Sequence, residues 1–256
     1  MRGSTTSVTR LSVNLNKIAL LRNSRHTGVP SLTSFARLAA NAGADGITIH
    51  PRPDERHIRA TDVAELAAAI APWRPGFELN IEGRPDLRLL ELIDAVKPEQ
   101  CTLVPDSPSV FTSEKGWDLT SDEITELRPI IDHLHAGGAR VMLFVDPAPE
   151  AVSRVPETGA DGIEIYTGAY ATSSRYGDGG VAMTACVKTA QAARAAGLAI
   201  NAGHDLSLLN LPPLIAAIDD LAEVSIGHEL TADALLIGFA NAIRAYRAAL
   251  RPRPAV

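Results

Sequence analysis

The chain has 256 residues, of which 46% are hydrophobic and 4% aromatic, and its formal net charge is −6. This length suits one large core and matches the ~250 residues typical of an eightfold β/α barrel. The acidic balance argues against a nucleic-acid-binding protein, because phosphate-backbone binding requires a basic face, although a local basic cluster would suffice for small anions. No apolar run approaches the ~20 residues that span a bilayer, and the first ten residues lack the apolar centre of a signal peptide. Since two cysteines suit a reducing compartment, we expect a cytoplasmic protein without membrane contacts.

The hydrophobic pattern predicts eight short strands that alternate with helices. The predicted strands cover 11–15, the run between Gly43 and His50, 77–81, 100–104, 139–145, 161–167, 198–202 and 223–226. The predicted helices cover 31–41, 61–71, 85–96, 121–136, 149–157, 181–196, 212–219 and 231–250. Loops are expected around Arg22 to His26, over 106–120 and over the Gly- and Ser-rich stretch 168–180. Residues 1–10 are expected to be a disordered N-terminal extension, 11–250 the folded domain and 251–256 a frayed tail.

Several junctions repeat one pattern, in which a helix ends, a glycine follows as C-terminal cap, and an apolar strand begins. The pentapeptide GADGI occurs twice, starting at Gly43 and at Gly159. Repetition of one strand–helix unit predicts an α/β protein of a single domain, a (β/α)8 TIM barrel with extra helices. An open doubly wound sheet is the alternative, but it normally carries a Gly-rich phosphate-binding turn after its first strand, where this chain has NLNK.

Polar residues gather at the predicted C-terminal ends of the strands, where barrels of this type place their chemistry. They include three of the seven histidines, and His57 follows closely. The strand-end residues are Asn14, Asn16, Lys17, His50, Arg52, Glu82, Asp146, Glu164, Asn201, His204 and His228. We therefore expect a common site at this rim of the barrel.

Two carboxylates stand out among these residues. Glu164 lies between Ile163 and Ile165 inside a strand, and a carboxylate buried in a barrel is costly unless it is paired. A buried ion pair with an arginine is the alternative to a functional role. Glu82 ends the third strand, and burial would raise its pKa and suit it to general-base catalysis. The alternatives for Glu82 are a loop carboxylate or a cap for the next helix.

The histidines near the last two strands point to proton transfer and anion binding. His204, in NAGHD, could exchange a proton near neutral pH, unless it is only a helix-terminus histidine. The Gly227-His228 turn precedes a helix, whose N-terminal N–H groups would bind phosphate, unless it is only a tight turn. A metal is not expected, because no HxH or HExxH spacing occurs. Lys17 is the sole strand-end lysine for a Schiff base, and we expect it to point to solvent.

Seven motifs together resemble the pyridoxine 5'-phosphate synthase family: VNLNKIALLRNSR, AGADGITIHPRPDERHI, NIEG, CTLVPD, GIEIYTGAYA, INAGHDL and SIGHEL. They occur in the family's order and extend over residues 11–250. The resemblance implies a TIM barrel that condenses 3-amino-2-oxopropyl phosphate with 1-deoxy-D-xylulose 5-phosphate to pyridoxine 5'-phosphate, phosphate and water. It implies no cofactor and no metal, since the substrate's own amine forms the imine. It also implies a homo-octamer built from dimers.

The resemblance assigns roles to individual residues. It implies that His50 and Glu82 are proton acceptors, that His204 is a proton donor, and that Glu164 stabilises the transition state or steers the loss of water. The residues implied to hold the deoxyxylulose phosphate are Arg52, His57 and Thr112. Those implied to hold the amino-oxopropyl phosphate are Asn14, Arg25, Asp205, Gly227 and His228. The long loop that carries Thr112 is expected to be a lid.

The chain departs from the family pattern at two places. Asn16-Lys17 stands where many members have Asp-His, and Asp205 stands where many have Gly. We therefore leave Asn16 and Lys17 out of the predicted site, and we expect the Asp205 carboxylate to raise the pKa of the neighbouring His204. Two other functions stay open at this point, because a fold does not determine its chemistry. One is a phosphosugar epimerase or aldolase on the same barrel, and the other is a non-catalytic phosphate-ligand binder.

Overall fold

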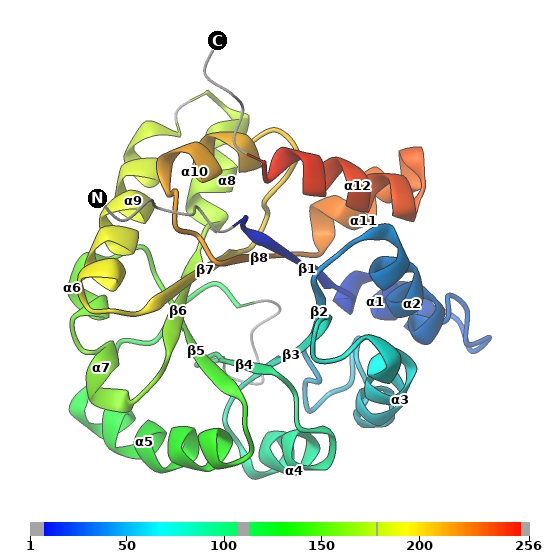
Figure 1. The fold of residues 1–256 in the computed structure, drawn as a ribbon, viewed down its shortest axis with the longest axis horizontal. Coiled ribbons are helices and arrows are strands. Elements are labelled where there is room, and N and C mark those ends of the chain that lie inside the picture. The colour runs from blue at the N-terminus through cyan, green and yellow to red at the C-terminus, as the bar shows by residue number, and fades with distance from the viewer. Residues whose placement is uncertain (1–7, 107–112, 178, 252–256) are drawn as a thin grey trace.

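The computed structural model describes residues 8–106, 113–177 and 179–251, and these residues form a closed barrel of parallel strands surrounded by helices (Figure 1). Each strand pairs with the next one in the sequence, and the last pairs with the first. The strands are β1 (Arg10–Asn14), β2 (Gly46–Ile49), β3 (Glu78–Gly83), β4 (Gln100–Leu103), β5 (Arg140–Val145), β6 (Gly162–Tyr166), β7 (Ala199–Gly203) and β8 (Glu223–Ile226). The predicted TIM barrel is confirmed, and the open sheet is excluded.

The helices pack around the outside of this barrel. They are α1 (Asn16–Asn23), α2 (Leu32–Ala42), α3 (Ala60–Ile70), η1 (Ala71–Trp73), α4 (Leu87–Val96), α5 (Ser121–Ala136), α6 (Pro149–Val152), α7 (Val155–Thr158), α8 (Gly168–Arg175), α9 (Gly180–Ala195), α10 (Leu211–Ala217), α11 (His228–Ile237) and α12 (Phe239–Ala249). Gly43 ends α2 with a φ of +93°, which is the left-handed conformation expected of a C-terminal glycine cap. Gly159 ends α7 in the same way.

Two helices occupy segments that were predicted to be loops. In α1, Ile18 and Ala19 pack into the core, and Arg22 forms a buried ion pair with Asp62 of α3. In α8, Tyr170 is buried and donates its hydroxyl to the Asn210 carbonyl at 2.7 Å. Both predictions were wrong because each segment is rich in polar residues and buries only a few side chains. The apolar periodicity that indicates a helix is therefore weak in both.

Two helices that were predicted to be continuous are interrupted. Gly238, at a φ of +83°, separates α11 from α12 within the predicted helix 231–250. The predicted helix 149–157 consists of α6 and α7, and Pro156 lies at the start of the second. A glycine in the left-handed region and a proline without an N–H are both effective helix terminators.

The two faces of the strands differ in polarity. Residues such as Val13, Ile47 and Ile81 belong to the large aliphatic core between the strands and the helices. The alternate residues face the barrel interior and are mostly polar. They form a ladder of side-chain hydrogen bonds across four strands, from Ser12 to Thr48, Asn80 and Thr102, with distances of 2.7 to 3.2 Å. The interior of the barrel is therefore a polar column that connects its two ends.

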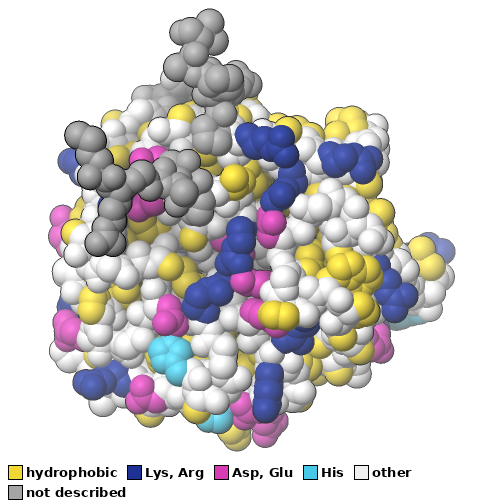
Figure 2. Space-filling model, viewed as in Figure 1, with side chains coloured by type: hydrophobic (Ala, Val, Ile, Leu, Met, Phe, Trp, Pro, Cys, Tyr) yellow, Lys and Arg dark blue, Asp and Glu magenta, His cyan; other side chains and the backbone are white. Residues whose placement is uncertain are grey.

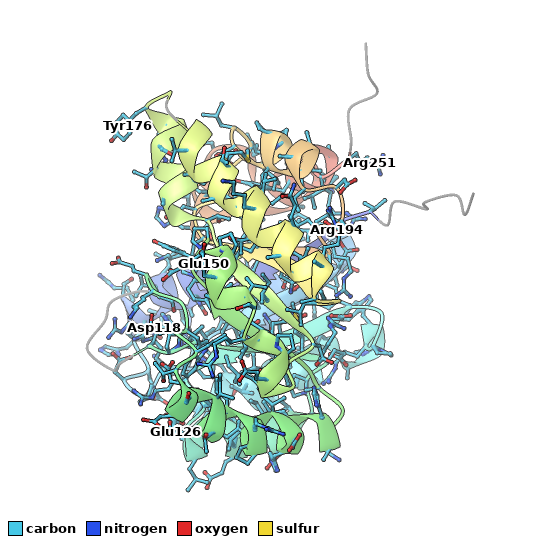
Figure 3. The ribbon with its side chains drawn as sticks, turned by 90° about the vertical axis from the view of Figure 1, so that its left-hand side faces the viewer. Asp118, Glu126, Glu150, Tyr176, Arg194 and Arg251 are labelled. Carbon is cyan, nitrogen blue, oxygen red and sulfur yellow. The ribbon has the colours of Figure 1, made fainter. Side chains whose placement is uncertain are left out.

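The outer surface carries charges of both signs. Lys and Arg side chains are interspersed with Asp and Glu on the face seen in the space-filling view (Figure 2). Glu126, Glu150 and Arg194 project outward from the helices (Figure 3), and Arg194 pairs with Asp219 and Asp220. None of the described helices has both the length and the apolar character that a membrane crossing requires.

Candidate active site

A cavity of about 300 Å³ opens at the C-terminal ends of the strands. Of the predicted site residues that the structure describes, all except Arg25 line it. The lining residues are Asn14, Asn16, Lys17, Leu20, His50, Arg52, Arg56, His57, Glu82, Ser113, Glu114, Glu164, Tyr166, His204, Asp205, Ser225, Gly227 and His228. The strand-end residues of β1, β2, β3, β6, β7 and β8 thus meet in one place.

One predicted residue does not join the others: Arg25 is exposed on the turn after α1 and does not line the cavity. Thr112 and part of the predicted lid fall within 107–112, outside the described residues. Ser113, which follows this gap, is buried and donates its hydroxyl to Asp106.

The two carboxyl groups that the sequence singled out lie deep in the cavity, and among the described residues neither forms an ion pair with a Lys or Arg side chain. Glu82 is 4% exposed and accepts a hydrogen bond from the Asn14 amide at 3.1 Å. Glu164 is 2% exposed and has the Thr102 hydroxyl at 3.5 Å. The alternative structural roles therefore do not apply: Glu164 has no arginine partner, and the helix cap of α4 is Asp86.

Burial determines the ionisation of these carboxyl groups. Burial raises the pKa of Glu82 to about 7, with a further contribution from the Asp106 carboxylate. Burial also raises the pKa of Glu164 well above its ordinary value, and the carboxyl groups of Glu82 and Glu223 add to the effect. At neutral pH Glu82 is therefore near its titration midpoint, and burial disfavours the ionised form of Glu164.

Gly203 at the end of β7 makes room for Glu164. A Cβ atom at position 203 would lie 2.1 Å from the Glu164 Oε1, so that no other residue fits without displacing the carboxyl. The Thr167 hydroxyl donates to the carbonyl oxygens of Gly203 and His204 and holds this turn. His204 and Asp205 follow with φ values of +81° and +56°, a conformation that is uncommon for residues other than glycine.

Burial disfavours the charged form of three imidazoles of the cavity, those of His50, His57 and His204. Burial lowers the pKa of His50 well below its ordinary value, and the nearby His57 and Arg52 lower it further. Burial and the Arg52 guanidinium lower the pKa of His57 to about 4. The two rings lie 5.9 Å apart between centroids. Burial also lowers the pKa of His204; the Asp205 carboxylate raises it, as expected, but by less than burial lowers it.

Arg52 is the best-positioned cation of the cavity. It is 3% exposed, and its Nη1 lies 2.9 Å from the Asp106 carboxylate, which also accepts from Ser113. This buried pair fixes the guanidinium at the cavity wall. Planar guanidinium groups of this kind suit phosphate binding, because they present several N–H donors in a fixed plane.

Sequence reasoning missed several residues of this cavity. Lys17 lines the cavity, contrary to the expectation that it points to solvent. The Asn16 side chain accepts from the His50 N–H at 3.0 Å and so couples β1 to β2. Tyr166 also lines the cavity, and its position two residues after Glu164 on one strand was a signal that could have identified it. Lys17 could be found only after α1 was known, since the helix turns it toward the cavity.

The turn at Gly227 and His228 lies where the sequence placed it. His228 begins α11, so the first N–H groups of this helix face the rim near Asn14. In residues 8–106, 113–177 and 179–251, no three His, Cys, Asp or Glu side chains are grouped closely enough to hold a metal ion. The remaining groups are imidazoles, carboxyls, amides and cations, which can move protons and bind anions.

Comparison with known proteins identifies the family. The family model "Pyridoxal phosphate biosynthesis protein PdxJ" matches residues 11–252. The chain belongs to this family. A pyridoxine 5'-phosphate synthase from Mesorhizobium japonicum is 51% identical over 237 residues, which cover 91% of this chain and 95% of that protein. The enzyme of the same name from Albidiferax ferrireducens is 47% identical over 243 residues, or 93% and 96% of the two chains.

Solved structures with low sequence identity support the fold alone. A tryptophan synthase structure from Mycobacterium tuberculosis has a TM-score of 0.66 at 13% identity and covers 97% of this chain and 95% of that chain. A thiamine phosphate pyrophosphorylase from Pyrococcus furiosus has a TM-score of 0.59 at 10% identity, with 95% of each chain covered. Lys17 and Asp205, which were expected to depart from the family pattern, both line the cavity.

Proposed function

We propose that this chain is a pyridoxine 5'-phosphate synthase, which condenses 3-amino-2-oxopropyl phosphate with 1-deoxy-D-xylulose 5-phosphate to pyridoxine 5'-phosphate, phosphate and water. The observation that carries the proposal is the pair of buried, unpaired carboxyls, Glu82 and Glu164, facing neutral imidazoles in one cavity. Ring closure with repeated loss of water needs groups that accept protons and groups that deliver them. The names of the relatives in this family support the choice of substrates.

The proposed proton acceptors are His50 and Glu82. Burial lowers the pKa of His50, so its imidazole is neutral at physiological pH. Burial raises the pKa of Glu82 to about 7, which is favourable for a base that works near neutrality. Glu164, whose ionisation is disfavoured by burial, would steer the loss of water by protonating the departing oxygen. His204 would donate a proton from the rim.

The proposed phosphate contacts lie on two sides of the cavity. Arg52, His57 and Thr112 would hold the deoxyxylulose phosphate. Asn14, Arg25, Asp205 and the Gly227-His228 turn would hold the amino-oxopropyl phosphate. Arg25 lies outside the cavity of its own chain, so its contact requires movement of the turn after α1 or arrival from another copy.

We also propose a cytoplasmic homo-oligomer, an octamer by analogy with the family, that works without cofactor or metal. Exposed apolar side chains at the end of α11 support an oligomer, because Leu235 and Leu236 are 79% and 85% exposed. The substrate amine itself would form the imine, and no enzyme lysine is needed for this step.

The decisive experiment mixes both phosphorylated substrates with the protein and follows the absorbance of the pyridine product. We expect turnover by the wild type, and loss of turnover with retained substrate binding for Glu82→Gln and His204→Asn. A protein that binds both substrates without forming the product would be a phosphate-ligand binder. Borohydride trapping of a substrate on Lys17 would instead favour the aldolase alternative.

A further inference from the structure

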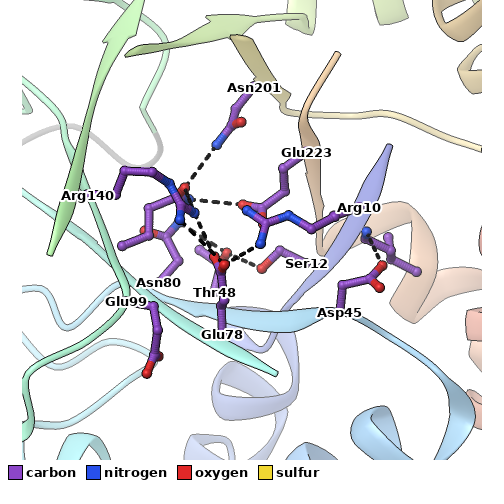
Figure 4. Close-up of polar contacts among 12 residues, drawn as sticks. Arg10, Ser12, Asp45, Thr48, Glu78, Asn80, Glu99, Arg140, Asn201 and Glu223 are labelled. Carbon is purple, nitrogen blue, oxygen red and sulfur yellow. Dashed lines mark hydrogen bonds and ion pairs between the residues drawn. The ribbon is translucent and has the colours of Figure 1, made fainter. Parts of the chain in front are cut away.

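The end of the barrel opposite the cavity contains a cluster of charged and amide side chains (Figure 4). We call it the base cluster, and its members are Arg10, Glu78, Gln100, Arg140, Asn201 and Glu223. Glu78 is paired with both Arg10 and Arg140. Glu223 has weaker support, since Gln100 donates to it at 2.9 Å and Arg10 lies 3.5 Å away.

Strand register connects this cluster to the active site. Glu164 of β6 is paired with Asn201 of β7, and Asn201 is paired with Glu223 of β8. Because paired residues of neighbouring parallel strands share one face of a barrel, all three side chains point into the same interior. Both carboxyls are nearly inaccessible to solvent, with exposures of 2% and 3%. Little water therefore screens one from the other.

We propose that Glu223 is a positioning residue for catalysis, whose carboxylate at the barrel base disfavours ionisation of Glu164 and so keeps that carboxyl in its acid form. The proposal rests on the proposed function, in which Glu164 delivers a proton. Glu223 does not line the cavity, but it would influence the pH at which Glu164 can donate its proton.

The charges around the two carboxyls are consistent with this arrangement. Glu164 is faced by Glu82 from β3, Glu223 from β8 and the Thr102 hydroxyl from β4, and none of these is a cation. Burial and then these two carboxyls raise the pKa of Glu164.

The surroundings of Glu223 keep part of it ionised. Arg10 faces it from β1, Glu78 from β3, Gln100 from β4 and Arg140 from β5. Burial raises the pKa of Glu223 to about 7 against the opposing effect of Arg10, so a large fraction is ionised above that pH. The carboxylate can therefore act on Glu164 throughout the neutral and alkaline range.

The test compares Glu223→Gln with Glu99→Gln. Both remove one carboxylate near the same end of the barrel. The Glu99 carboxylate accepts from Arg74 and the Leu79 N–H, and among the described residues it accepts no hydrogen bond from a side chain of the base cluster. Two readouts are measured: the alkaline limb of the pH–kcat profile, and the infrared C=O band of the Glu164 acid form, assigned by its loss in Glu164→Gln. We expect Glu223→Gln to shift both to lower pH by roughly one unit. Glu99→Gln should leave both unchanged, and Glu223→Asp should retain most of the wild-type behaviour.

Unchanged titration of the Glu164 band in folded Glu223→Gln would overturn the proposal. If that variant does not fold, Asn201→Asp replaces it, since it adds a carboxylate one strand nearer and should shift the band to higher pH; no shift would again overturn the proposal. The infrared titration needs no turnover. A wild type without turnover would therefore contradict the proposed function, while the band would still decide the role of Glu223.

Discussion

Glu78 and Glu82 lie four residues apart on β3, and both point into the barrel, yet they ionise in opposite ways. Burial acts to raise the pKa of Glu78, but hydrogen bonds from Arg140 and Arg10 outweigh it and lower the pKa below its ordinary value. For Glu82, burial and the Asp106 carboxylate outweigh the Asn14 hydrogen bond and the Arg52 charge, and the pKa rises to about 7. One strand thus carries an ion-paired, structural carboxylate at the base and, at the rim, a carboxyl that titrates near neutral pH.

The pKa values of Glu78 and Glu82 differ because their surroundings differ, although both residues belong to the same strand. At the base, guanidinium groups satisfy the carboxylate, so ionisation and folding favour each other. At the rim, ionisation of Glu82 opposes folding: the stability that its protonated form provides is complete below the unfolded pKa of 4.5 and is lost as the pH rises through about 7. A poised acid–base group therefore reduces stability at neutral and alkaline pH.

The largest effect is expected where the rim has no spare volume. Gly203→Ala places a methyl group 2.1 Å from the Glu164 Oε1, so the carboxyl must move and kcat should fall by roughly 100-fold. The control is Gly180→Ala at the start of α9, where an added Cβ would have no neighbour within 4 Å. Steady-state kinetics measure both variants, and equal rates for Gly203→Ala and wild type would contradict the assigned position of Glu164.

An intermediate effect, on stability alone, is expected at the base. Glu78→Gln leaves Arg10 and Arg140 without their carboxylate, and the free energy of unfolding should fall by roughly 1–3 kcal/mol. The matched control is Glu157→Gln, because that carboxylate is half exposed and water screens its pair with Arg154, so its loss should leave stability nearly unchanged. Denaturant unfolding measures the change. If Glu78→Gln lowered kcat but not the free energy of unfolding, Glu78 would not be the structural carboxylate that distinguishes the base from the rim.

The smallest effect concerns pH. A general base works when deprotonated, so with a pKa of about 7 for Glu82 the value of kcat/KM should fall as the pH decreases, by about tenfold between pH 8 and pH 6. Glu78, which has a lowered pKa, should contribute nothing in this range. A pH–rate profile that remains flat down to pH 5 would show that Glu82 is not the titrating base.

Much of the fold and of the site could be predicted from local patterns. The repeated unit with its glycine stop is visible at Gly43 and Gly159, because alternation and capping act over a few residues. Those strand boundaries then placed His50, Glu82, Glu164 and His204 at one rim. Short helices were missed where the buried face was small, as in α1, and with α1 the orientation of Lys17 was missed as well.

Local sequence patterns were enough to predict that eight similar units form a barrel with acids, imidazoles and cations at the C-terminal ends of its strands. Which carboxylates pair with a cation became visible only in the folded chain. Arg10 and Arg140 are 68 and 62 residues from Glu78 along the chain, and barrel closure brings them together. Ionisation depends on desolvation and on charges contributed by other strands, and neither can be read from a short stretch of sequence.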